Sequence, residues 1–130
     1  MYKKTTDNIT VNVYPLFLDD QSSPENSTYM WAYYIRIENE SKESIQITKR
    51  HWKIIDSSGH IQEVNGDGVV GEKPIIEPKK IYEYASGVPL KTPSGFMEGY
   101  YVAECENGET FNVLVPAFSL DSPFDNKKYN

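Results

Sequence analysis

The chain has 130 residues, which is the usual size of one domain and too few for a catalytic domain with a second unit. Its formal net charge of -6 at pH 7 argues against general binding of DNA or RNA, because counterion release requires clustered Lys and Arg. The single cysteine, Cys105, excludes an internal disulfide, and the sequence has neither a long apolar run nor an apolar signal segment after MYKKTTDN. We therefore expect one cytoplasmic domain over residues 1–130 that binds neither nucleic acid nor membrane.

Apolar and polar residues alternate with a period of two along much of the chain, and no window shows sustained helical spacing. Alternation in NITVNVYP predicts a first strand, and the polar DDQSSPENST predicts a loop after it. In YMWAYYIRIEN, Trp31, Tyr33 and Ile35 would face a core while Arg36 faces solvent. Near the C-terminus MEGYYVAEC and ETFNVLVP alternate in the same way, and the intervening ENG predicts a hairpin turn that pairs them.

The segment SIQITKRHWKIIDSSGHIQEV predicts a hairpin that contains a bulge. The apolar parity changes between Ile47 and Trp52, and a β-bulge between them would reconcile the two parities. DSSG is a turn sequence, so we expect residues 50–55 and 60–65 to pair. The numbers of paired residues would then sum to about 115.

Seven or more short strands separated by Gly and Pro turns, including one in KKIYEYAS, predict an all-β fold. The favoured architecture is a two-layer antiparallel β-sandwich, and a small barrel is the alternative. The polar DSPFDNKKYN, at about 121–130, lacks periodicity and predicts a loose tail.

The segment EVNGDGVVGEKP contains the spacing G-x-G-x-x-G at Gly66, Gly68 and Gly71, which in dinucleotide-binding folds precedes a helix. Here Pro74 and Pro78 follow, so no such helix is expected. We favour glycines that serve turns at the rim of the sandwich. The alternative is a nest of backbone amides that binds a phosphate or a carboxylate.

The predicted hairpin register brings Arg50, His51, Trp52 and Lys53 beside Gly66. A cation, an imidazole and a large aromatic ring next to exposed amides could bind a small anion or an acidic segment of a partner. For Trp52 a place in the core is the more common role, and for Arg50 and Lys53 a solvated one.

The segment SGVPLKTPSGFMEG, residues 86–99, holds two prolines and three glycines and predicts a shaped surface loop with a binding role. Thr92, Pro93, Ser94 and Gly95 are its candidate binding residues. A crossover between the two sheets is the alternative.

The sequence predicts no catalytic residues, no metal site and no cofactor. His51 and His60 would lie about 13 Å apart on the hairpin and could not share an ion. Cys105 has the parity of a buried strand residue, where a thiol behaves as a small apolar group. No Ser is accompanied by a nucleophile elbow or by ordered Asp and His partners.

Several blocks occur together in order and make the chain resemble the ApaG family, also called CorD. The blocks are RHW, V-x-G-x-G-V-V-G, Y-x-S-G-x-P-L-x-T-P-S-G-x-M-x-G and P-A-F-S-L. The resemblance implies a fibronectin type III/immunoglobulin-like antiparallel β-sandwich. It also implies an association with divalent-cation homeostasis, namely cobalt tolerance and magnesium efflux, and a likeness to protein-binding domains of eukaryotic proteins. It brings no catalytic residues.

Together these patterns predict a non-enzymatic binding module, with a protein as its partner, whose rim is formed by residues 50–53, 65–72 and 88–97. The alternative is a binder of a small anion, a nucleotide or pyrophosphate through the glycine-rich loop, with hydrolase activity as an extension. Direct sensing of cobalt or magnesium is a third hypothesis. The sequence leaves the oligomeric state open, including a dimer through an exposed strand edge.

Overall fold

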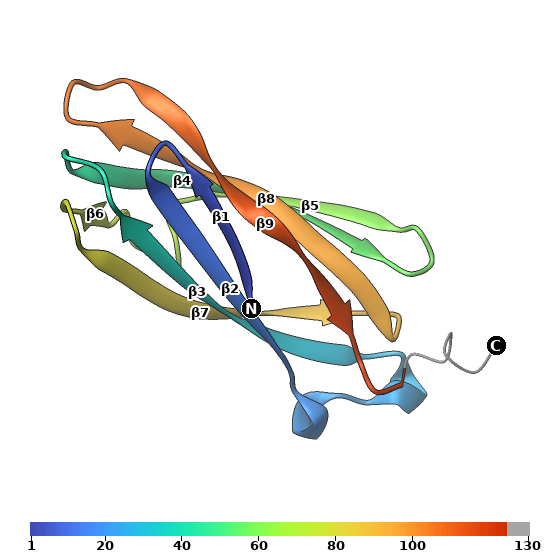
Figure 1. Ribbon diagram of the computed structural model, residues 1–130. Helices are drawn as coiled ribbons and strands as arrows, with labels where there is room; N and C mark the ends of the chain where they lie inside the picture. The colour runs from blue at the N-terminus through green and yellow to red at the C-terminus, as the bar shows by residue number, and fades with distance from the viewer. Residues whose placement is uncertain (125–130) are drawn as a thin grey trace.

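The computed structural model describes residues 1–124, which contain nine β-strands and two short 3-10 turns but no α-helix (Figure 1). The strands are β1 (Tyr2–Thr6), β2 (Ile9–Phe17), β3 (Tyr29–Asn39), β4 (Ile45–Asp56), β5 (Ile61–Asp67), β6 (Ile75–Ile76), β7 (Ile81–Leu90), β8 (Ser94–Cys105) and β9 (Thr110–Asp121). The turns η1 (Asp19–Gln21) and η2 (Pro24–Asn26) lie in the predicted loop between β2 and β3. Over this described range, no helix has the length and apolar character to cross a membrane.

The strands form two antiparallel sheets that pack face to face. The four-stranded sheet has the order β1-β2-β3-β7, and the five-stranded sheet has the order β5-β4-β8-β9, with β6 also pairing with β4. The structure confirms the predicted all-β antiparallel sandwich. The alternative of a barrel is wrong, because no strand of one sheet pairs with a strand of the other within residues 1–124.

The core lies between the sheets and is built from the alternating residues that the sequence singles out. On β3 the inward side chains of Trp31, Tyr33 and Ile35 are all buried. The Tyr33 ring lies 5.4 Å from the Trp52 ring of β4 and 6.1 Å from the Phe118 ring of β9, measured between centroids. Burial of each such side chain contributes roughly 2 kcal/mol to the free energy of folding, so these contacts hold the two layers together.

A β-bulge in β4 confirms the predicted change of parity. The pairing of β4 with β8 shifts between Ile47 and Lys49, so that one residue of β4 is left over. Both Ile47 and Trp52 consequently face the core. Because neighbouring residues of a strand point to opposite faces, the bulge also decides which side chains around position 50 point outward.

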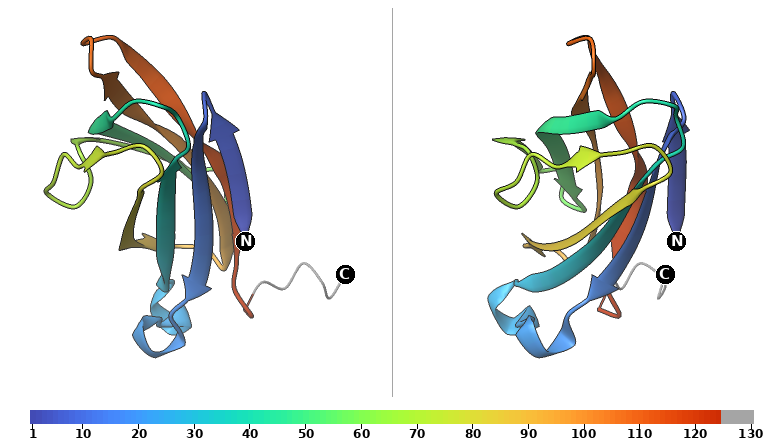
Figure 2. Two further views of the ribbon diagram at one scale, coloured as in Figure 1. Left: turned by 60° about the vertical axis from the view of Figure 1, so that its left-hand side comes forward. Right: turned by 90° about the vertical axis from the view of Figure 1, so that its left-hand side faces the viewer.

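The sandwich is closed along one side and open along the other. Figure 2 shows β1 beside β9, where the Thr6 hydroxyl accepts a hydrogen bond from the Leu114 amide at 3.2 Å. The opposite side is formed by the free edges of β5 and β7, each of which pairs with only one neighbour in its sheet.

The segment 86–99 is not the predicted surface loop, because most of it belongs to β7 and β8. Residues 91–93 alone connect these strands, and the connection crosses from one sheet to the other, as the alternative proposed. Pro89 is tolerated because β7 is an edge strand. Glycine is needed at 95 and 99, where an added Cβ would lie 2.5 Å from the Ile55 carbonyl oxygen and 2.1 Å from the His51 carbonyl oxygen.

The expected loose tail does not begin at residue 121. Asp121 is the last residue of β9, and the buried Ser122 donates its backbone amide to the Pro93 carbonyl at 3.0 Å. The ring of Phe124 lies 6.1 Å from that of Phe17, between centroids. A buried polar residue and an aromatic ring tie this segment to the sandwich, and the rest of the predicted tail, 125–130, lies outside the described residues.

Candidate functional site

The predicted hairpin of β4 and β5 is present, but its register differs from the prediction by one residue. His51 pairs with Asn65, and Arg50 pairs with Gly66, so the paired numbers sum to 116 instead of 115. The reason is that the Asp56 amide donates to the His60 carbonyl at 3.1 Å, which leaves a loop of three residues instead of four. The consequence is that His51 lies directly opposite Asn65.

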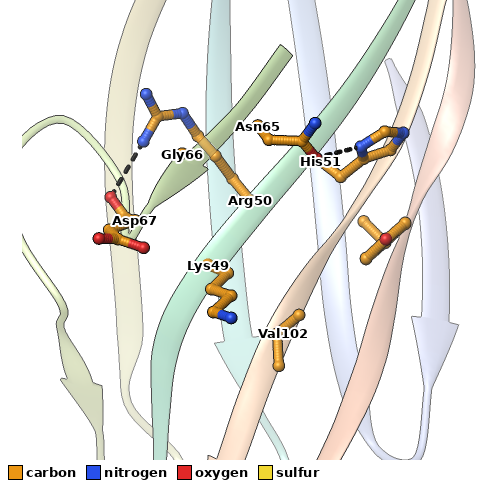
Figure 3. A pocket seen from close by; sticks show the side chains of 8 residues that line it. Lys49, Arg50, His51, Asn65, Gly66, Asp67 and Val102 are labelled. Atoms are coloured by element: carbon orange, nitrogen blue, oxygen red, sulfur yellow. Dashed lines mark hydrogen bonds between the residues drawn. The ribbon is translucent and has the colours of Figure 1, made fainter. Parts of the chain in front are cut away.

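The four candidate residues of β4 are divided between the two faces of the sheet. Trp52 is 3% exposed and belongs to the core, as expected, with its ring 6.2 Å from that of Tyr101. Arg50 has the same parity, while His51 and Lys53 point to the outer face. Figure 3 shows Arg50 and His51 leaving β4 in opposite directions. Neither Arg50 nor Lys53 is fully solvated as expected, since both are half-buried.

Arg50 holds the glycine-rich loop. Its Nη1 donates to the carbonyl oxygens of Asp67 and Gly68, both at 3.1 Å. Its guanidinium occupies the space above Gly66, where a Cβ would lie 2.6 Å from the Arg50 Cζ. A side chain at residue 66 would displace the guanidinium, so the packing of Arg50 explains Gly66 without a ligand.

The remainder of the loop is a tight turn whose amides already have acceptors. The amide of Gly68 donates to the Thr48 carbonyl at 2.8 Å, and the amides of Val69 and Glu72 donate to each other's carbonyls at 2.8 and 2.9 Å. Val70 and Gly71 between them have φ of +46° and +80°, as in a two-residue hairpin turn. The turn interpretation thus accounts for Gly68 and Gly71, and these three amides are not free to form an anion nest.

The outer face of the five-stranded sheet carries a stacked pair of rings. The imidazole of His51 lies 5.0 Å from the Tyr100 ring, between centroids, with an angle of 27° between the planes. The His51 Nδ1 is 2.6 Å from the Asn65 Oδ1. Next to the pair on the adjoining strand is Leu114, which is 39% exposed. Lys49, Asp67 and other residues complete a shallow cavity of about 490 Å³ (Figure 3).

Thr92, Pro93, Ser94 and Gly95 lie far from this pair. Gly95 pairs with Asp56, whereas Gly66 pairs with Arg50, so the two groups are separated by six residues of β4, or about 20 Å. The Thr92 Oγ1 accepts a hydrogen bond from the Ser57 amide at 3.0 Å and donates to the Ser94 carbonyl at 2.7 Å. These residues fasten two turns together and do not share a surface with Gly66. Other parts of the predicted rim do meet, because Val88 and Met97 line one cavity with Arg50 and Trp52.

Comparison with known proteins decides the family. A family model described as the ApaG domain matches residues 19–105. The chain is 51% identical over 130 residues to Protein ApaG of Paramagnetospirillum magneticum and 50% identical over 130 residues to Protein ApaG of Rhodospirillum centenum, and covers 100% of both chains in each comparison. The chain belongs to the ApaG family. A crystal structure of an ApaA protein from Bordetella pertussis has a TM-score of 0.86 at 42% identity, covering 90% of this chain and 95% of that chain.

The ApaG sandwich also contains a polar cluster that the sequence interpretation missed. The hydroxyls of Tyr84 from β7 and Tyr101 from β8 share a hydrogen bond across the two sheets. Burial raises the pKa of both phenols, and it also raises the pKa of Tyr33, where hydrogen bonding with Ser86 and the charge of Arg50 oppose it. Alternation in KKIYEYAS places Tyr84 on one face of its strand, but that pattern does not reveal a partner from the other sheet.

The remaining candidate ligands do not converge in this ApaG chain. His51 and His60 lie at different positions along the hairpin. His51 pairs with Asn65 in the middle of the strands, whereas His60 lies opposite Asp56 at the turn. No group of three or more His, Cys, Asp or Glu side chains suited to a metal ion is found in residues 1–124. Cys105 is half-buried and not fully buried as expected, and its pKa is raised by burial and by Glu43.

Proposed function

We propose that this member of the ApaG family is a non-enzymatic binding module that contacts another protein through the outer face of its five-stranded sheet. The observation that carries the proposal is the stacked pair of His51 and Tyr100. Aromatic side chains with a polar end are enriched in protein interfaces, where they bury a large area at a small cost in side-chain entropy.

The pair is held in position before any partner binds. The contact of His51 with the Asn65 amide fixes the imidazole, and the stacking fixes the phenol ring over it. Preorganisation of this kind reduces the entropy lost on association. Two exposed apolar side chains extend the same face, Phe96 with 40% and Leu114 with 39% of its area exposed.

The chemistry of the face supports contact and not catalysis. His51 pairs with an amide and a phenol ring instead of a carboxylate and a nucleophile, so its imidazole lacks the partners of a general base. The alternative of phosphate binding by the glycine-rich loop is not favoured, because the amides of Gly68, Val69 and Glu72 have acceptors within the loop and β4.

We infer that the module acts in the cytoplasm and that any effect on cobalt tolerance or magnesium efflux passes through its protein partner. The dispersed positions of His51, His60 and Cys105 support an indirect effect. A direct effect would require several ligands within about 2 Å of one ion.

Quantitative capture of the partner tests the proposal. The immobilised chain and its Tyr100→Ala variant are exposed to the same cell extract, and bound proteins are measured. Tyr14→Ala is the matched control, because Tyr14 is 39% exposed on the outer face of the other sheet. Loss of a central interface aromatic costs about 2 kcal/mol, so we expect specific capture to fall more than about tenfold in Tyr100→Ala and to persist in Tyr14→Ala. Equal capture by a folded Tyr100→Ala variant would overturn the proposal.

A further inference from the structure

The open side of the sandwich contains a cavity that the proposed function does not use. It has a volume of about 210 Å³ and lies between β5 and β7, with walls from both sheets. Its polar lining consists of Tyr33, Arg50, Gln62 and Ser86, and its apolar lining includes Trp52, Val88 and Met97.

The polar lining favours a negatively charged ligand. The chain has 19 Asp and Glu residues and a net charge of -6, yet none of the residues around this cavity is acidic, and Arg50 is its one charged side chain. The guanidinium, the Gln62 amide and the Ser86 hydroxyl can all donate hydrogen bonds. The Tyr33 hydroxyl hydrogen-bonds with that of Ser86, so this pair has one hydroxyl proton left to donate to a ligand.

Arg50 has an unused pair of donors. Its Nη1 serves the carbonyls of Asp67 and Gly68, while its Nε and Nη2 donate to no side chain or carbonyl within residues 1–124. These two nitrogens form one edge of the guanidinium, and such an edge binds a carboxylate through two parallel hydrogen bonds. Because the loop already fixes the guanidinium above Gly66, little further side-chain entropy is lost when an anion binds.

The apolar lining indicates the size and polarity of the part of the ligand that does not contact Arg50. Trp52, Met97 and Val88 are buried residues whose surfaces contribute to the cavity wall. A volume of 210 Å³ holds about seven non-hydrogen atoms if each takes a share near ~30 Å³, as a water molecule does. A short branched chain would cover this apolar wall, which bare phosphate or acetate would leave wet.

We propose that this cavity binds the carboxylate of a short, branched apolar group through Arg50, with the apolar group against Trp52 and Met97. Such a group could be a free small carboxylic acid or the C-terminal residue of an extended peptide, and both have the same chemistry. Arg50 also lines the outer cavity beside His51 and Tyr100, but neither of those two residues lines the inner cavity.

Titration of the isotope-labelled chain with isovalerate, followed by NMR, tests the site. We expect saturable shifts of the Gln62 side-chain amide, the Trp52 indole and the backbone amides of 86–88 at millimolar concentration. Isopentylamine, which has the same branched chain but carries a positive charge, should leave these signals unchanged. No shift with isovalerate, or an equal response to the amine, would overturn the proposal.

A pair of variants on β5 provides a control that does not disturb Arg50. Gln62→Glu places a carboxylate at the cavity from an exposed position, whereas Glu63→Gln removes one on the opposite face of the same strand. Binding of isovalerate should weaken at least tenfold in Gln62→Glu and stay unchanged in Glu63→Gln. Unchanged binding by folded Gln62→Glu would also overturn the proposal.

Two peptides distinguish the source of the carboxylate. A short peptide that ends in leucine is compared with the same peptide whose C-terminus is amidated. Tighter binding of the free acid peptide than of isovalerate, lost on amidation, identifies a peptide terminus as the ligand. Binding of isovalerate without binding of the peptide identifies a free acid, and both results support a carboxylate site.

Discussion

The guanidinium of Arg50 lies directly over Gly66, with its Cζ, Nη1 and Nη2 all within 2.7 Å of the position that a Cβ of residue 66 would occupy. Arg50 and Gly66 are paired across the hairpin. The large side chain of Arg50 therefore fills the space that Gly66, which has no side chain, leaves open. This relationship explains one member of the G-x-G-x-x-G motif by packing alone. Arg50 also lines the cavity on the open side of the sandwich.

The three glycines of the motif should differ in their tolerance of alanine. Gly68→Ala should destabilise the fold by about 3 kcal/mol or more, because its φ is +59° and the new Cβ would lie 1.9 Å from the Glu72 carbonyl oxygen. Gly71→Ala should cost only about 1 kcal/mol, since its φ is +80° but the space around it is open. Gly66→Ala should fall between them, because the flexible Arg50 can move at the loss of its hydrogen bonds.

Urea denaturation of the three variants measures this order of stability. A ligand-binding role for the glycines would leave the free energy of unfolding nearly the same in all three. Equal stabilities would therefore contradict the account of the loop as a structural turn.

The effects on stability of removing the Tyr84 hydroxyl and of removing the Tyr101 hydroxyl should not be additive. Tyr101 is fully buried, so Tyr84→Phe leaves its hydroxyl without the partner it has in the folded chain. We expect this change to cost about 1–3 kcal/mol, the penalty for a buried unsatisfied polar group, while Tyr84→Phe/Tyr101→Phe should be closer to the unmodified chain. A double-mutant cycle by urea denaturation checks this, and additive costs would contradict the contact.

The stability of the β4–β5 turn should depend on acid pH through Asp56. Its Oδ1 accepts hydrogen bonds from the Ser58 hydroxyl at 2.6 Å, the Ser58 amide at 2.9 Å and the His60 amide at 3.0 Å. The Ser58 hydroxyl is the main cause that lowers the pKa of the Asp56 carboxyl from 3.8. A lowered pKa in the folded state gives a stabilisation that is complete above pH 3.8 and is lost as the pH falls through the folded value.

Denaturation of the chain and of its Asp56→Asn variant from pH 7 downwards tests this dependence. The variant should be less stable at pH 7, and the difference should shrink below pH 3.8 as the carboxyl of the unmodified chain becomes protonated. A difference that stays constant across the acid range would mean that the charge of Asp56 does not contribute.

The sequence predicted the sandwich because side-chain parity is a local property of each strand. Trp31 and Tyr33 reveal an inward face by their spacing alone, and the change of parity between Ile47 and Trp52 was sufficient to predict the bulge. The predicted register of the hairpin was wrong by one residue, because the same turn sequence can close a loop of three or four residues. That choice depends on whether Asp56 bonds to His60.

Other relationships depend on contacts between distant segments and could not be read from local patterns. Thr92 and Gly66 were grouped wrongly because no local pattern says which end of a strand a given turn occupies. The contact of Tyr84 with Tyr101 joins the two sheets, and each tyrosine taken singly resembles any alternating strand residue. The stacking of His51 on Tyr100 joins neighbouring strands whose pairing the sequence left unassigned.

Hydroxyl-radical footprinting of the chain, free and bound to the partner it captures, tests most directly whether His51 and Tyr100 form the contact surface. The method reports oxidation of exposed aromatic and imidazole side chains, and Tyr14 and Tyr34 on the outer face of the other sheet provide an internal comparison. Binding should protect His51 and Tyr100 from oxidation, while oxidation of Tyr14 and Tyr34 should be unchanged. Protection of Tyr14 and Tyr34 with undiminished oxidation of His51 and Tyr100 would contradict the proposal.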